Sequence, residues 1–600
     1  MQQKDKYPDK RHSILIVIAL VLLFLCPLIY ALSRRQSIQV VDCLPAPSNA
    51  PQSADGHFVD QQLIVMGPRD QLTAVTGQTT VTAILSPVVP GCDLGYLGQI
   101  SHSPDRTLEN TLYRRDELRT LQVNLYQIDA STTVTQAIEI VNAESARLGT
   151  RVYADPNYLT AGMVNAEACG NPNSTGGSPN STGGSPNSTG GSGGGTSRLP
   201  ASFDTYSKQW AFEHIGLGSV LHASYEAARV NYQGDGIRVG VFDTSPFGET
   251  AAQAQARGTN TWAPVVEPVN WVTPALTLTV FMPPLQSAVM ASSPGVSLTH
   301  VLTDISDHGL FVSGLIHAVA PDSEVQLYPV LDQYGCGNLY TLITRLHTFI
   351  SQAEVDRQDG RLNGAVINLS LGVLKPKNTD VIGKPAAPAP AELQQAQAPA
   401  ESLPQQLNEA YALLKTDDIQ SLAMTMQIAY QQGIVVVAAA GNDSWRDEYQ
   451  SQPRPPQYPA AYPFVIGVAG SNAGRQRSCF SNWGDVSAPA GDGAPGEVTI
   501  VSGTITSTTP VTCAASLNLP LVSVVTNKTG QYPQGYAYWN GTSFATPLVS
   551  GLAALVLDAG RQQGMGLISP GNVGRAIKCG AATSDGVINV PVTILRCLRP

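Results

Sequence analysis

The chain has 600 residues, of which only 13% are charged, and its formal net charge is −10. This length exceeds that of a typical single domain and predicts two or three domains. The sequence shows no basic patch, and together with the negative charge this argues against nucleic acid as a partner. Glycine, proline, serine and threonine are plentiful, which suits an extracytoplasmic protein with long loops.

Residues 14–32 form an uninterrupted stretch of 19 residues without charge. At about 1.5 Å per residue, a helix of this length nearly spans the core of a bilayer. More lysine and arginine residues precede the stretch than follow it, so we expect the N-terminus to stay in the cytoplasm and the rest of the chain to be exported. Two interpretations of residues 1–35 remain open. The length favours a membrane anchor, whereas Ala31 and Ser33 also suit the cleavage site of a signal peptide.

Residues 36–170 are expected to hold a separate small α+β domain. The segment LQVNLYQI at 121–128 has the pattern of a strand, and residues 133–149 have the periodicity of an amphipathic helix. Residues 151–162 predict a second strand that ends at a turn.

A low-complexity tract follows at residues 171–197, where PNSTGGS occurs three times in tandem. Such a glycine- and serine-rich tract is a flexible linker with an end-to-end reach of about 30 Å. It would hold the small domain near the rest of the chain at high effective concentration. It is also a natural place for proteolytic nicking.

Two apolar runs in the second part of the chain end in polar residues of the kind found in active sites. Between Gly236 and Asp243 only Arg238 is polar, which predicts a strand buried on both faces of a parallel sheet. Asp243 would end this strand, and open α/β sheets place their sites at such carboxyl ends. The run GIVVVAAAGN is similar and places Asn442 just after a strand. Taken singly, each of the two residues could simply belong to a turn.

His308 is the candidate base. It stands in the segment DISDHGLFVSGLIHAVAPDSEVQLYPVL. Histidine suits this role because its ordinary pKa lies near neutral pH. The chain has nine histidines, so residue type alone does not select one. His317 and His347 are its competitors.

Ser543 lies in NGTSFATPLVSGLAALV, between a glycine and the start of an apolar helix. Gly541 would let a substrate backbone approach closely. We expect Pro547 in the first helical turn, where its missing N–H costs nothing. The helix N-terminus would place unpaired N–H groups and a partial positive charge beside the Ser543 oxygen. A lone serine here is usually an N-cap, but a chain that also offers a base, a carboxylate and an amide donor suits a nucleophile.

These motifs resemble those of the subtilisin-like serine proteases, the subtilases. Seven consecutive residues, GTSFATP, fit the nucleophile motif of that family. The chain order of aspartate, histidine and serine is that of subtilisin. Two departures occur, because Ser245 replaces the glycine of Asp-Thr-Gly and Leu310 replaces the threonine of His-Gly-Thr. The resemblance implies that Asp243 orients His308, and that His308 activates Ser543.

The resemblance also implies an oxyanion hole and a substrate cleft. Asn442 and the backbone N–H of Ser543 would bind the oxyanion. In the related sedolisins a glutamate and an aspartate replace this histidine and asparagine, so the residues found here favour neutral or alkaline chemistry. The cleft would have one edge that pairs with an extended substrate and one wall of the primary pocket, formed respectively by Ser370, Leu371 and Gly372 and by Ala439, Ala440 and Gly441. For these six residues, ordinary strand packing is the alternative.

By the same resemblance, residues 198–600 should form a three-layer α/β/α catalytic domain with a mostly parallel sheet. The domain within residues 36–170 weakly resembles the inhibitory propeptide of subtilases, and an unrelated small domain is the alternative. The chain would then be a zymogen, held at the membrane through residues 14–32 and inhibited by its own propeptide. We expect it to cut itself between about Ala166 and Gln209.

The expected function is that of an exported serine endopeptidase acting on polypeptides. Two rivals are a pseudoprotease that binds peptides without turnover and a hydrolase or transpeptidase acting on cell-wall peptides. The chemistry requires no cofactor, no cysteines show metal-ligand spacing, and no run identifies ligands for the structural calcium that relatives often bind. Eight cysteines lie outside the apolar stretch, an even number that predicts disulfides. Cys579 and Cys597 are the first candidate pair, because they flank one short C-terminal stretch.

Overall fold

The computed structural model describes residues 58–89, 91–94, 117, 120–162, 200–217, 232–247, 261–262, 278–281, 305–333, 335–373, 419–444, 453–491, 497–501, 504–508, 519–526, 532 and 534–598. The apolar stretch 14–32 and the repeat tract 171–197 lie outside these residues. The expected domain boundaries near residues 35, 170 and 197 therefore stay predictions.

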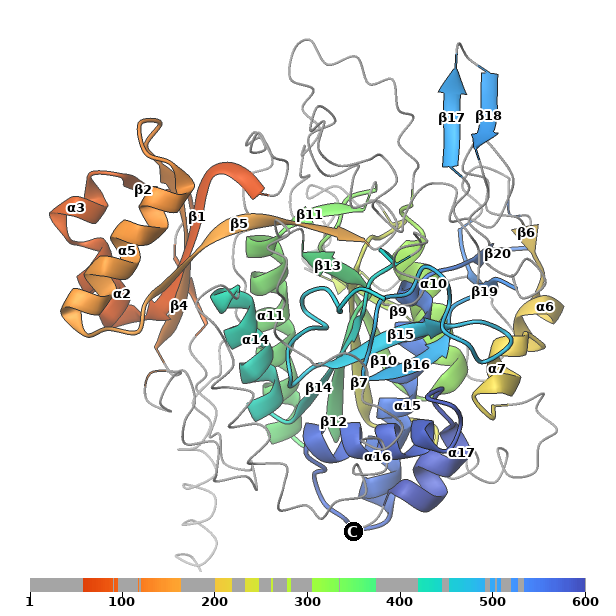
Figure 1. Cartoon of the computed structure of the whole chain (residues 1–600). Coiled ribbons are helices and arrows are strands. Elements are labelled where there is room, and N and C mark those ends of the chain that lie inside the picture. The colour runs from red at the N-terminus through yellow and green to blue at the C-terminus, as the bar shows by residue number, and fades with distance from the viewer. Residues whose placement is uncertain are drawn as a thin grey trace, which may run out of the picture. The chain divides into compact units, whose positions relative to one another are not determined.

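An eight-stranded sheet forms the centre of the C-terminal part (Figure 1). All neighbouring strands are parallel except β8 and β9. In spatial order the strands are β16 (Val486–Pro489), β15 (Ile466–Ser471), β14 (Ile434–Ala439), β12 (Gly364–Leu369), β7 (Ile237–Asp243), β10 (Glu324–Pro329), β9 (Leu278–Phe281) and β8 (Thr261–Trp262). The predicted strand before Asp243 and the mostly parallel sheet are both confirmed.

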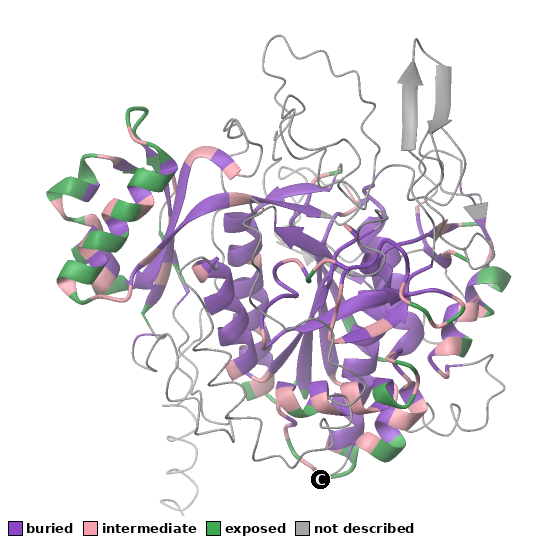
Figure 2. Cartoon of the chain, in the orientation of Figure 1, coloured by how far each residue is buried: buried purple, intermediate pink, exposed green. Residues whose placement is uncertain are grey.

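Helices cover both faces of this sheet. On one face, β7 places Val239 and Val241 in an apolar cluster with α10 (His308–Val319), α15 (Thr542–Gln562) and α16 (Pro570–Ala582). On the other face, Phe242 packs in a second cluster with α11 (Leu339–Gln358) and α14 (Gln420–Gln431). Successive residues of a strand point to opposite faces, so a strand buried on both is apolar throughout. The three-layer α/β/α prediction is confirmed, and Figure 2 shows the sheet and α15 as buried.

The parallel strands place several carboxyl ends at one edge of the sheet. The chain enters the sheet at β7, continues to β8, β9 and β10 on one side, and then crosses to β12 and β14 on the other side. Ligand sites of open α/β sheets lie at such a point of reversal, beyond the carboxyl ends of the strands. Asp243 ends β7, Ser370 follows β12, and Asn442 lies three residues beyond β14.

Helix α15 differs from the sequence expectation in one respect. It begins at Thr542, so Pro547 lies inside the helix rather than in its first turn. Among the described residues α15 alone is long and apolar enough to cross a membrane, and its residues from Thr542 to Gly560 are all buried within the fold. Packing between the sheet and the neighbouring helices accounts for its apolar composition.

Residues 58–162 contain a smaller α+β arrangement. Strands β5 (Tyr153–Gly162), β1 (Phe58–Pro68), β4 (Leu121–Ile128) and β2 (Leu85–Pro87) follow one another antiparallel, and β3 (Cys92–Asp93) also pairs with β4. One face of this sheet packs with α2 (Arg69–Thr76), α3 (Thr79–Thr82) and α5 (Val134–Leu148). The other face shares the apolar cluster of α11 and α14. The predicted strand at 121–128 and the predicted helix are confirmed, and a Thr133–Gln136 capping box begins α5.

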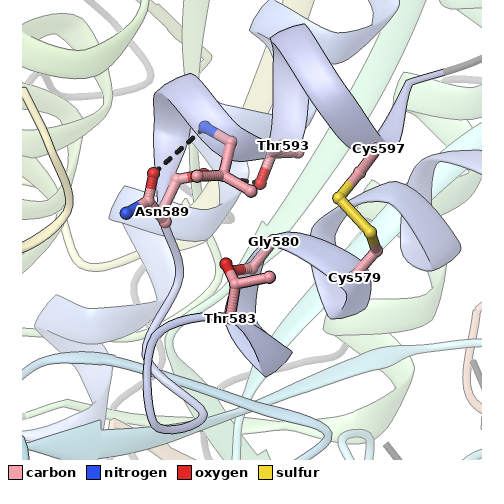
Figure 3. Close-up of a disulfide and its surroundings, with 7 residues drawn as sticks. Cys579, Gly580, Thr583, Asn589, Thr593 and Cys597 are labelled. Atoms are coloured by element: carbon pink, nitrogen blue, oxygen red, sulfur yellow. Dashed lines mark hydrogen bonds between the residues drawn. A yellow bond between two sulfur atoms is a disulfide. The ribbon is translucent and has the colours of Figure 1, made fainter. Parts of the chain in front are cut away.

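The predicted disulfide between Cys579 and Cys597 is present (Figure 3). It joins α16 to the last turn of the described chain, next to the Asn589 cap of α17. Cys92, Cys336 and Cys479 are also disulfide-bonded. The elements not yet named are β6 (Pro200–Ala201), α6 (Phe203–Ser207), α7 (Trp210–His214), β11 (Cys336–Asn338), β13 (Leu371–Val373), β17 (Glu497–Val501), β18 (Thr504–Thr508), β19 (Leu521–Val524), β20 (Tyr536–Trp539), α17 (Val590–Val592) and η5 (Thr593–Cys597).

His347 predicts a loss of stability in acid. Its ring is buried between α11 and α14, bonded through Nε2 to Thr425 Oγ1 at 3.1 Å, and burial lowers the pKa of His347 to about 3. An unfolded histidine titrates near about 6.5. The unfolded state therefore gains a proton first as the pH falls, and the free energy of unfolding should drop by about 2 kcal/mol between pH 7 and pH 5.

The His347→Gln variant should lack this contribution. Urea unfolding midpoints of the unmodified and variant chains at the two pH values measure the difference. If both chains lose the same stability between pH 7 and pH 5, the buried ring is not the acid-sensitive group.

Candidate active site

Asp243 and His308 form a buried pair. Asp243 is the last residue of β7 and His308 the first of α10, and both side chains are 0% exposed. His308 Nδ1 lies 2.7 and 2.9 Å from the two carboxylate oxygens of Asp243. The backbone N–H of Thr244 also donates to this carboxylate at 2.6 Å. A histidine bonded through Nδ1 has its orientation fixed and presents Nε2 as the group that can exchange a proton.

Thr244 fixes the start of α10 against the end of β7. Its hydroxyl lies 3.1 Å from the Ile305 carbonyl and 2.9 Å from the Ser306 carbonyl, and it accepts from the Gly309 N–H at 3.2 Å. A Cβ on Gly309 would lie 2.3 Å from the Thr244 carbonyl oxygen, so a side chain at that position would push the helix away from β7. The glycine after His308 therefore allows the close approach that the pair requires.

Two aromatic side chains pack against the His308 ring. The Trp539 ring centroid is 5.2 Å away in an edge arrangement, and that of Phe544 is 5.1 Å away. Trp539 ends β20 and Phe544 follows Ser543, so both come from the segment that carries the serine. The two rings thus cover part of the imidazole, which is fully buried.

Ser543 is the second residue of α15. Gly541 precedes the helix with φ 145°, a backbone conformation that favours glycine. The Ser543 hydroxyl donates to the Ser370 carbonyl at 3.2 Å, and His308 Nε2 has no hydrogen-bond partner among the residues that the structure describes. The structure thus brings the aspartate and histidine together but does not bond the histidine to the serine. Rotation about the Cα–Cβ bond of Ser543 would turn its hydroxyl from the Ser370 carbonyl to His308 Nε2. Catalytic hydrogen bonds often tighten only when substrate binds.

Asn442 contacts the residue before the serine. Its Oδ1 accepts from the Thr542 N–H at 3.0 Å and from the Thr542 hydroxyl at 2.8 Å. Two donors on the same oxygen fix the orientation of the amide, so its NH₂ group lies on the side away from Thr542. A fixed N–H donor near a serine at a helix N-terminus can stabilise a developing oxyanion.

The first group of residues expected to line the cleft follows β12, and this strand edge is occupied. Leu371, Gly372 and Val373 form β13, which pairs antiparallel with β5 of the smaller part. On its other side β5 pairs with β11, which the sequence reasoning missed. Residue 371 lies opposite 162, and 372 opposite 161. Strand β5 thus occupies the position of an extended peptide added to an exposed sheet edge.

The second group of expected cleft residues lies around the end of β14. Ala439 pairs with Val468 of β15, and the Ala440 N–H donates to the Val468 carbonyl at 2.9 Å. Gly441 follows with φ 114° and its carbonyl accepts from the Asn482 N–H at 3.0 Å. The backbone of these residues is thus used in sheet and loop contacts, while Asn442 follows directly.

Two side chains of β5 contact helix N-termini, which was also missed from the sequence. Asp155 accepts from the Ser421 N–H at 2.7 Å and the Gln420 N–H at 3.3 Å, at the start of α14. Asn157 Oδ1 accepts from the Tyr340 N–H at 3.0 Å, at the start of α11. Helix N-termini leave such N–H groups without intrahelical partners. The DPN triplet inside an extended segment was the available signal, because polar residues that repeat on one strand face require partners there.

Among the described residues, no group of three or more histidine, cysteine, aspartate or glutamate side chains could hold a metal ion. Burial raises the pKa of Tyr340, near β5, to about 12, which keeps this hydroxyl neutral.

All four candidate residues lie within a match to a known family. The family model described as "Subtilase family" matches residues 234–577, more than half of the chain. The chain belongs to the subtilase family. The match includes Asp243, His308, Asn442 and Ser543.

Curated relatives of this subtilase include two proteins from Bacillus. The minor extracellular protease Epr of Bacillus subtilis is 26% identical over 270 residues, which cover 44% of this chain and 28% of Epr. The subtilisin of Bacillus pumilus is 29% identical over 274 residues, 44% of this chain and 67% of that protein. The chain thus matches little more than a quarter of Epr.

Solved structures of similar proteins include fervidolysin from Fervidobacterium pennivorans, described as a keratinolytic enzyme related to subtilisin. Fervidolysin is 16% identical to this chain. The superposition covers 92% of this chain and 65% of fervidolysin, with a TM-score of 0.43. A lanthipeptide protease is 17% identical, covers 65% of this chain and 95% of that chain, and gives a TM-score of 0.36.

Proposed function

We propose that this subtilase is a serine endopeptidase that hydrolyses peptide bonds through an acyl-enzyme. One observation carries the proposal: a buried aspartate–histidine pair lies at the carboxyl edge of the sheet, against the aromatic residues that flank the serine. The family match spans the same residues. Substrates are polypeptides, because an extended backbone fits between β11 and β13.

Each residue has one task in this mechanism. Ser543 Oγ attacks the peptide carbonyl carbon while His308 Nε2 takes the hydroxyl proton. Asp243 orients His308 and stabilises its charged form. The Asn442 NH₂ group and the Ser543 N–H donate to the oxyanion. His308 then gives the proton to the leaving amine, the acyl-enzyme forms, and water releases the acid by the same steps.

We further propose that the chain is made as a self-processing zymogen. Strand β5 fills the place of substrate, so residues 58–162 act as a propeptide and intramolecular inhibitor. Asp155 and Asn157 add contacts outside the cleft. These contacts do not involve the cut bond, so they keep the fragment bound after cleavage.

The register of β5 supports a particular cut. Gly162, the last described residue of β5, lies opposite Leu371, which follows Ser370, and the Ser370 carbonyl accepts the Ser543 hydroxyl. Met163 itself lies outside the described residues. We therefore propose the Met163–Val164 bond as the processing site, a few residues before the range expected from the sequence.

The same proposal covers location. Residues 14–32 anchor the precursor or direct its export, with the N-terminus in the cytoplasm and the catalytic domain outside the membrane. The similarity to Epr, which is named as an extracellular protease, supports export of the catalytic domain. One cut after Met163 then separates the catalytic domain from the apolar stretch. Bound structural calcium remains compatible with the fold, with no ligands assigned.

A fluorophosphonate probe tests the proposed chemistry. The purified chain should be labelled at Ser543 and should cleave a peptide library, whereas Ser543→Ala should do neither. Binding of peptides without labelling or cleavage would favour a pseudoprotease. Cleavage confined to cell-wall peptides would favour the second rival.

A further inference from the structure

A buried chain of polar side chains connects the sheet to the serine. Ser550 Oγ donates to Asn368 Oδ1 at 2.9 Å, and Asn368 Nδ2 donates to Ser370 Oγ at 3.1 Å. Ser370 Oγ donates to the Ser543 carbonyl at 2.8 Å, and Ser543 Oγ donates back to the Ser370 carbonyl. All four side chains are 0% exposed. We call Ser550, Asn368 and Ser370 the serine–asparagine relay.

Pro547 explains why the Ser543 carbonyl needs this partner. In an α-helix the carbonyl of residue 543 would accept from the N–H of residue 547. Residue 547 is a proline inside α15 and has no N–H to donate. A buried carbonyl without a donor is costly. Ser370 supplies the missing donor from outside the helix, from the end of β12.

We propose that Ser370 is a positioning residue whose hydroxyl replaces the helix hydrogen bond that Pro547 cannot make, and so fixes Ser543 relative to β12. Asn368 and Ser550 hold the Ser370 hydroxyl in the orientation that donates to the Ser543 carbonyl. The role is separate from the backbone pairing of residues 371–373 with an extended peptide. It rests on the proposed catalytic function of Ser543.

The geometry matters because the serine and the histidine come from different elements. His308 is fixed to β7 through Asp243 and Thr244. Ser543 is fixed to the end of β12, a strand of the same sheet, through the serine–asparagine relay. Because β7 and β12 are neighbouring parallel strands, the central sheet fixes the positions of both His308 and Ser543. Loss of the Ser370 hydroxyl removes a contact that positions Ser543 and leaves the contacts of His308 unchanged.

The Ser370→Ala variant tests the role. Normalised to active sites titrated with a fluorophosphonate, kcat on a chromogenic peptide should fall about tenfold, the factor expected for one ordinary hydrogen bond. KM should stay within about threefold, since uniform substrate binding is not affected. Ser370→Thr, which keeps the hydroxyl, should retain most of the activity.

Pro547→Ala provides the decisive second variant. In the Ser370→Ala background it gives residue 547 an N–H that can donate to the Ser543 carbonyl, so kcat should recover by about fivefold or more. A buried hydroxyl that merely adds stability would not be replaced in this way. Ser351→Ala is the matched control, because it removes a buried hydroxyl that donates to the His347 carbonyl in α11 at 2.6 Å, and its kcat should be unchanged.

Three results would overturn the proposal. They are an unchanged kcat in Ser370→Ala, a rise in KM alone, and a double variant no more active than Ser370→Ala. If Ser370→Ala does not fold, the double variant is compared with Pro547→Ala. Equal kcat values within about threefold then support the role, and a further tenfold loss contradicts it. An unmodified chain that does not react with the probe would instead contradict the proposed function itself.

Discussion

Ser543→Ala should accumulate as the full-length chain, while the unmodified chain should yield a shorter form that begins at Val164. The alanine has no nucleophile, and in subtilisin, a relative, removal of the nucleophile lowers kcat about 10⁶-fold. This magnitude is carried over from that relative. Self-processing at such a rate is negligible on the time scale of expression.

Expression in a host that lacks related proteases allows the comparison. Reduced samples are blotted at the C-terminus, because several cysteines are disulfide-bonded and could hold cut fragments together. Ser351→Ala should be processed like the unmodified chain. If Ser543→Ala gives the same shortened product, another protease makes the cut. A mature N-terminus at or beyond Ala166 would leave self-processing intact but contradict the register-based site.

Asn442→Ala should lower kcat by about 10²–10³-fold, the effect that loss of this donor has in subtilisin. The magnitude is again that of the relative. The physical reason lies in the amide orientation, since Thr542 occupies Oδ1 and so directs the NH₂ group to the opposite side. The donor acts on charge that develops in the transition state, so KM should change little.

The control for this variant is Thr542→Val, which keeps the Asn442 amide but removes one of the two donors that orient it. Its loss should be smaller, within about tenfold. Unfolding midpoints of both variants separate misfolding from a catalytic effect. A purified Asn442→Ala chain that cleaves peptides at the unmodified rate would rule out Asn442 as the oxyanion donor.

Features set by local pattern were predictable from the sequence. The strand at 121–128 and the strand ending at Asp243 have the bounds expected from their apolar patterns. The helix after Thr133 follows from its periodicity and its capping box. Asp243, His308, Asn442 and Ser543 were found because each stands next to the start or end of an apolar element, in a motif that resembles those of the subtilases.

Features set by contacts between distant segments were not predictable. The pairing of β5 with β11 and β13 joins residues from 175 (161 to 336) to 213 (160 to 373) positions apart, and no local pattern encodes it. Pro547 was expected in the first turn because proline is favoured there. The helix tolerates it further in because a hydroxyl from another strand supplies the missing hydrogen bond. The asparagine within the apolar run GAVINLSLG was the one sequence signal for that contact.

Helices α11 and α14 are covered on two sides. In α14 every residue from Ser421 to Tyr430 is buried, and both helices share one apolar cluster with the central sheet and with β1 and β4 of the smaller part. Loss of residues 58–162 would expose to water the side of α11 and α14 that these residues cover. It would also leave the N–H groups at the starts of the two helices to form hydrogen bonds with water. The proposed maturation would therefore exchange a dry interface for a newly hydrated surface, and the separated fragment would have to be degraded or captured for that exchange to be permanent.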